Sequence, residues 1–109
     1  MARVRVDAGR IVDRDSFHRT FREVMGFPAA YAMDMGAWIV CMSHLGDPEA
    51  GMTRVAFEPG GVLVIEIAKA IGFRGRCPEL FAELVECTAF VNHRFAEEGQ
   101  PPPLALLFL

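Results

Sequence analysis

The sequence lacks any apolar run long enough to cross a membrane. Glu66 interrupts the run Val62–Ile65, and Leu104–Leu109 is also short, whereas a spanning helix needs about 20 apolar residues. Met1–Asp7 places a charge at every second position from Arg3 onward and has no signal-peptide core. We therefore expect a cytoplasmic protein that makes no membrane contact.

Cysteine is scarce, with only Cys41, Cys77 and Cys87. An odd number in a domain large enough to fold without disulfides indicates reduced thiols, as in the cytosol. Zinc needs three or four ligands at recognisable spacings. The chain has no Cys-x-x-Cys pair, and its histidines, which include His44 and His93, form no His-x-x-x-His pair. We therefore expect no metal and no cofactor.

Strong charge and catalytic motifs are also missing. The formal net charge is −3, with 11 basic residues scattered along the chain, which argues against nucleic acid as the main ligand. Neighbours such as Ser43 and His44 cannot face each other as nucleophile and base. No Gly-rich phosphate loop precedes Lys69, and the carboxylates of 79–86 fit a solvated helix face. We expect no catalytic residues.

What the chain has in abundance is apolar content, 52% of its 109 residues. This length suits one domain over 1–109. The mean hydropathy is +0.26. Either the core is large for this chain, or apolar surface remains for a partner.

Periodicity and capping residues predict an α/β fold. We expect a small three-stranded parallel sheet with packed helices, plus a local hairpin of 53–57 and 62–67 joined by the turn 58–61. The final run does not alternate, which predicts a strand covered on both faces. The predicted elements are strands at 3–8, 62–67 and 104–109, and helices from Ser16 to Gly26, Asp34 to about Leu45, and Pro78 to Gly99. His18, on the first helix, is expected at the surface or at the rim of the site.

The second predicted helix is the most informative segment. At 100° per residue, one stripe forms its core side: Met35, Trp38, Met42 and Leu45. The opposite side carries no charge: Met33, Gly36, Val40 and Ser43. Such a helix is either buried on both sides or presents a binding surface, and we favour the binding surface.

The segment 68–76 is a second anomaly, because it follows a strand and mixes apolar residues with glycines and cations. Loops after strands are favoured ligand sites in α/β sheets. In one interpretation a short helical turn places Ile71 and Phe73 in the core. In the other they are interface anchors flanked by Arg74 and Arg76.

Several motifs resemble those of barstar-related proteins over nearly the whole chain. They are Ile11–His18, Phe27-Pro28-x-x-Tyr31, Asp34–Met42, Gly60–Leu63, Arg76–Glu79 and Val85–Asn92. The resemblance implies a three-stranded parallel sheet with packed helices. It also implies the function of barstar, a bacterial intracellular inhibitor that plugs the active site of a secreted ribonuclease.

The resemblance also locates the partner-binding positions: Ala30, Asp34, Gly36, Ile39, Val40, Ser43, His44 and Leu45. Gly36 and Val40 stand where the family carries carboxylates, so the scaffold fits but the acidic contacts are gone. Our candidate surface adds the altered positions Ala32 and Met33, together with Ile71 and Phe73. Natural divergence and engineering both produce such a pattern, and its clustering on one surface favours engineering.

These observations favour a non-enzymatic protein-binding module with a rewritten, apolar interface. The alternative is an inhibitor of a secreted microbial ribonuclease with altered contacts. An enzyme that uses Cys41 or His44 is a third possibility, disfavoured because neither has a base or metal partner. The same apolar face is also able to form a homodimer.

Overall fold

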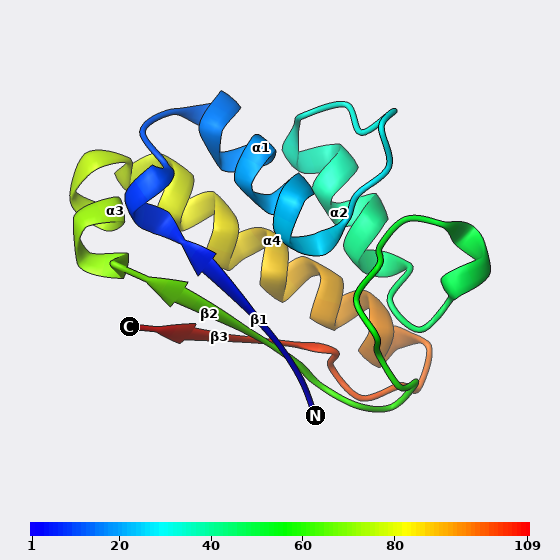
Figure 1. Ribbon diagram of the computed structural model, residues 1–109. Coiled ribbons are helices and arrows are strands. Elements are labelled where there is room, and N and C mark those ends of the chain that lie inside the picture. Colours follow the sequence, from blue (N-terminus) through cyan, green and yellow to red (C-terminus); the bar gives the residue numbers. More distant parts are fainter.

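The computed structural model describes residues 1–109 and is built on one parallel sheet. Its strands are β1 (Ala2–Asp7), β2 (Leu63–Ala68) and β3 (Leu104–Phe108), in the order β1-β2-β3. Both pairs are parallel, with Val4 opposite Ile65 and Ile65 opposite Leu106. The predicted α/β fold with a three-stranded parallel sheet is confirmed (Figure 1).

The predicted hairpin is wrong. Residues 53–57 form a loop, although the expected turn is present, since Gly61 N–H donates to the Glu58 carbonyl at 2.9 Å. The reason is topological: β2 is the central strand, and β1 and β3 occupy both of its edges. The loop is instead tied to a helix end, because Arg54 N–H donates to the Met25 carbonyl at 2.9 Å.

The expectation that 104–109 is covered on both faces is also wrong. The helices lie on one side of the sheet (Figure 1), and β3 is an edge strand, so Leu107 and Leu109 remain substantially exposed. On β1 and β2 the uncovered face is polar: Glu66 pairs with Arg3 at 2.6 Å and with Arg5 at 3.8 Å.

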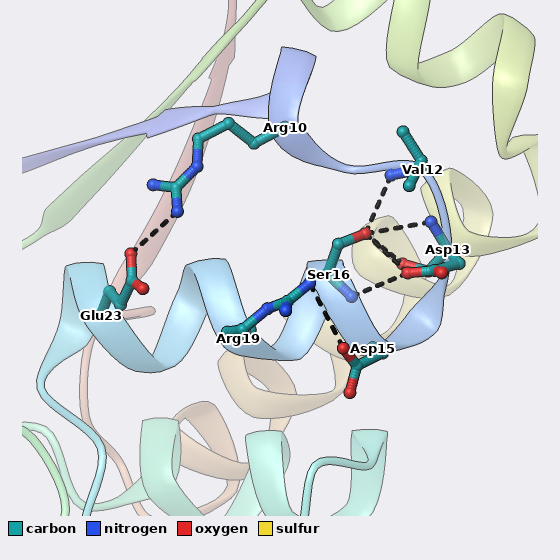
Figure 2. A network of polar contacts seen from close by, with 7 residues as sticks. All are labelled: Arg10, Val12, Asp13, Asp15, Ser16, Arg19 and Glu23. Carbon is teal, nitrogen blue, oxygen red and sulfur yellow. Dashed lines mark hydrogen bonds and ion pairs between the residues drawn. The ribbon is translucent and has the colours of Figure 1, made fainter.

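Helix α1 (Arg14–Met25) follows the short 3-10 helix η1 (Ala8–Arg10) and starts earlier than Ser16. The N-cap is Asp13, whose carboxylate accepts the Ser16 N–H at 2.8 Å, while the Ser16 hydroxyl accepts the N–H groups of Val12 and Asp13. Figure 2 shows this capping box. The box therefore satisfies the Ser16 N–H of the first turn and the N–H groups of Val12 and Asp13 just before it. Gly26 ends the helix with φ +67°, as predicted.

The other helices are α2 (Met35–Ser43), α3 (Ala70–Arg76) and α4 (Pro78–Glu97), and a second 3-10 helix, η2 (Pro48–Ala50), lies in the loop after α2. Asp34 caps α2, as predicted, by accepting the Ala37 N–H at 2.7 Å. Pro78 opens α4 at the position where its missing N–H costs nothing. None of the helices is both long and apolar enough to cross a membrane.

The core lies between the helices and the inner face of the sheet. Trp38, Met42 and Leu45 are buried and Met35 is partly so, which confirms the predicted inner stripe of α2. The Trp38 ring meets Phe21 of α1 edge-on, with centroids 5.8 Å apart. Helix α2 thereby contacts α1 on its inner side and packs more extensively against α4, while its opposite side faces outward.

Candidate protein-binding site

The outward side of α2 is uncharged and accessible. Gly36 is exposed and Val40 is 47% exposed, while Ser43 is partly buried. The structure thus separates the two sides of α2 as the 100° periodicity predicts. The outward side of α2 thus combines a half-exposed apolar side chain with an absence of charged residues. Such a surface can bury apolar area against another protein.

The segment that leads into α2 is anchored by a buried pair, His18 and Tyr31. His18 is only 1% exposed, so the expected surface or rim position is wrong. Its Nδ1 lies 2.6 Å from the Tyr31 hydroxyl, and the Tyr31 ring packs on Phe27 with centroids 4.7 Å apart. Burial lowers the pKa of His18 and raises that of Tyr31. The neutral imidazole and phenol are therefore the forms that suit this site.

Just before α2, Met33 has φ +62°, a left-handed conformation that is costly for a residue with a Cβ. Its side chain packs partly against the core. Asp34 then returns to an extended conformation, with φ −138°, and caps the helix. The turn at Met33 is what brings the Asp34 carboxylate over the first N–H groups of α2.

At the other end of α2, the side chains of two candidate residues contact backbone carbonyl groups of the helix. The Ser43 hydroxyl donates to the Ile39 carbonyl at 2.6 Å, and His44 Nδ1 lies 2.7 Å from the Val40 carbonyl. A groove of about 470 Å³ separates this end from the C-terminal end of α4. Asp47, Arg94 and Glu98 line it, so both signs of charge border the site there.

The structure brings ten of the twelve predicted site residues together on or around α2. The exposed members are Ala30, Ala32, Asp34, Gly36 and Val40, and the half-buried ones are Met33, Ile39, Ser43 and His44. Leu45 is the exception within the group, since it is 5% exposed and belongs to the core. Its place as a contact residue is corrected, because it lies on the inner stripe with Trp38 and Met42.

The other two predicted residues lie elsewhere. They belong to α3, at the end of the sheet away from α2 (Figure 1). Phe73 is fully buried against Phe17 and Phe81, with ring centroids 6.4 and 5.8 Å away, so its assignment as an anchor is wrong. Ile71 is 89% exposed. Two residues apart on a helix point in different directions, so one side chain enters the core and the other does not.

The groups considered for chemistry lie in different structural environments. Cys41 is 3% exposed, and burial raises the pKa of its thiol, which disfavours the reactive thiolate. No three His, Cys, Asp or Glu side chains lie close enough together to hold a metal ion. Glu83 forms an ion pair with Arg14 of α1, and this lowers the pKa of that carboxyl.

Sequence reasoning missed the His18–Tyr31 pair, although both residues lie in quoted motifs. The available signal was that His18 is flanked by Phe17 and Phe21 at core spacing. It also missed Asn92, whose side chain bonds both backbone groups of Leu104.

Together, the fold and this surface define a class: small α/β proteins with a three-stranded parallel sheet that present a capped, outward-facing helix. Residues 1–106 match the family described as Barstar (barnase inhibitor), and the chain therefore belongs to the barstar family. That family is one of inhibitors, which supports a protein-binding role of the barnase-inhibitor kind. A comparison with curated proteins finds no match.

Proposed function

We propose that this chain is a non-enzymatic protein-binding module that contacts its partner through the outward side of α2 and residues 30–34. One observation carries the proposal: the nine residues of α2 include no charge, yet Gly36 and Val40 face solvent. A helix that only covers a core normally carries charged residues on its outer side.

The character of this surface supports a partner that binds by apolar burial. Burial contributes roughly 25 cal/mol per Å² before the entropy of association is subtracted. The Asp34 carboxylate accepts the Ala37 N–H, and the groove at the C-terminal end of α2 is lined by Arg94 as well as by Asp47 and Glu98. Mixed charges give little of the single-sign field that steers a strongly basic partner.

Family membership favours a second candidate, the inhibition of a secreted microbial ribonuclease. In that case the same side of α2 covers the active site of the ribonuclease. The two candidates differ in whether this chain inhibits a ribonuclease without carboxylates at positions 36 and 40.

The direct test titrates a barnase-type ribonuclease with the unmodified chain and with a Gly36→Asp/Val40→Asp variant. Gly36 tolerates a side chain, because an added Cβ meets nothing nearer than the Asp34 carboxylate at 3.4 Å. A matched control is Val12→Asp/Gly75→Asp, which adds the same charge at exposed positions away from α2. We expect inhibition by the Gly36→Asp/Val40→Asp variant only.

Tight, stoichiometric inhibition by the unmodified chain would contradict an apolar, re-targeted surface and favour the second candidate. Inhibition by the control variant as well would show that added negative charge acts without regard to position, which contradicts the assignment of α2.

A further inference from the structure

The outer edge of β3 has unpaired backbone groups. Leu63 N–H donates to the Pro103 carbonyl at 2.7 Å, and Leu109 N–H donates to the Ile67 carbonyl at 2.9 Å. In a parallel pair, alternate residues of a strand bond the same neighbour. Odd-numbered residues of β3 therefore face β2, and residues 104, 106 and 108 direct their N–H and C=O groups outward.

Only the first of these three is satisfied within the chain. The Asn92 side chain of α4 accepts the Leu104 N–H at 3.0 Å and donates to the Leu104 carbonyl at 3.0 Å. Leu106 and Phe108 have no outward partner, because β3 is an edge strand and no side chain bonds them. Two N–H and two C=O groups stay open on a short stretch centred on Leu107.

Charged residues and prolines, which often protect edge strands, are absent from β3. Its sequence is Leu-Ala-Leu-Leu-Phe, and Leu107, Phe108 and Leu109 are between 41% and 51% exposed. The opposite edge, β1, is protected by Arg3, Arg5 and Asp7. Of the two edges, only that of β3 accepts another strand without burying a charge on it.

The helix beside this edge is uncharged on the same side. Phe81 of α4 packs on Phe108 with ring centroids 5.1 Å apart, and Asn92 bonds Leu104, so this side of α4 follows β3. Helical spacing places Val85 and Ala89, both exposed, on the same side of α4. We call this side of α4, together with the β3 edge, the β3 strip. The charged group at its border is Arg74, 6.0 Å from the Phe81 ring centre.

We infer that the β3 edge pairs with β3 of a second copy, antiparallel and about a twofold axis at Leu107, so that two sheets become one. In an antiparallel pair, directly opposite residues exchange both backbone bonds. Leu106 of each copy then pairs with Phe108 of the other, which uses all four open groups. Leu107 meets its own copy, and such an isologous contact closes at two chains.

A second copy fits better than an extended peptide. The open stretch is short, and Asn92 closes it at Leu104, so a longer strand gains no bonds there. The β3 strand is also uncharged, so the edges of two copies can meet without electrostatic repulsion. The strand offers no charge that would select a charged partner.

The test measures the mass of the full chain by light scattering during size exclusion, over a concentration series. We expect the unmodified chain and the control Val12→Lys to approach twice 12.1 kDa. Leu107→Lys and Leu107→Glu should each be monomeric, because like charges then meet at the axis. An equimolar mixture of the two should restore the dimer, which a folding defect cannot do.

Hydrogen exchange locates the interface: the amides of Leu106 and Phe108 should exchange more slowly as the concentration rises. An unmodified chain that stays monomeric at every concentration overturns the inference. So does a dimer that persists in Leu107→Lys but is lost in Val40→Lys, because the contact then lies on α2.

Discussion

Among single residues, His18 couples solution pH to the segment that leads into α2. Its imidazole is buried and bonded to Tyr31, and burial lowers its pKa from the ordinary 6.5, against the opposing effect of the Asp34 carboxylate. The folded chain therefore binds this proton less readily than the unfolded chain. It follows that the stability contributed by His18 is complete above pH 6.5 and is lost as the pH falls below it.

We expect the urea midpoint to fall as the pH is lowered below 6.5. This decrease should be absent in His18→Gln, because glutamine keeps a hydrogen-bonding side chain but does not titrate. The lowered pKa values of Asp13 and Glu83 act in a separate window, starting from 3.8 and 4.5. Tyr31→Phe serves as a control, since it leaves His18 buried without its partner at a cost of about 1–3 kcal/mol. An identical midpoint-against-pH curve for His18→Gln and the unmodified chain would contradict this account.

At the level of elements, α2 has two sides with different energetic roles. Trp38 is fully buried, and its ring packs edge-on against Phe21 of α1. Trp38→Ala should cost about 3–5 kcal/mol, the usual range for emptying an aromatic site. Val40→Lys, on the outward side, should change stability by less than about 1 kcal/mol. The denaturant midpoints of the two variants, compared at equal m-values, measure these changes in unfolding free energy. An equal loss of stability in both variants would mean that α2 is buried on both sides.

The elements that could be predicted are those marked by local chemistry. Asp34 before an apolar helix, Gly26 after one and Pro78 at the start of another are capping signals that depend on nearest neighbours. The alternation in 3–8 marks β1 in the same way. The two sides of α2 also follow from periodicity alone, whereas most candidate site residues around that helix are implied by the barstar resemblance.

The predictions that failed depend on contacts distant in sequence. Whether 53–57 pairs with β2 is decided by β1 and β3, which occupy both edges. The exposure of Leu107 depends on which face of the sheet the helices cover. Phe73 and Ile71 differ because α3 turns one of them toward Phe17 and Phe81, and no property of the segment 68–76 itself selects which one.

On the scale of the whole molecule, one continuous core joins every strand and each of the four α-helices. Its buried members come from both ends of the chain, from Val6 of β1 to Leu104 of β3. Helix α4 pairs with α1 through Glu83 and Arg14 and with β3 through Asn92 and Leu104. No group of elements has a separate core, which is the physical basis for expecting one cooperative unit over 1–109.

Cooperative unfolding can be followed with two probes that report on different levels of structure. Trp38 is the only tryptophan and lies in the core, so its fluorescence reports tertiary packing, while far-ultraviolet circular dichroism reports the helices. In the monomeric Leu107→Lys variant the two urea transitions should coincide, as a two-state domain requires. In the unmodified chain they should also coincide, but the midpoint should rise with protein concentration, because dimer formation stabilises the folded state by mass action. Two separated transitions in the variant would show that 1–109 is not one unit. A midpoint independent of concentration in the unmodified chain would contradict the pairing of two copies through the β3 edge.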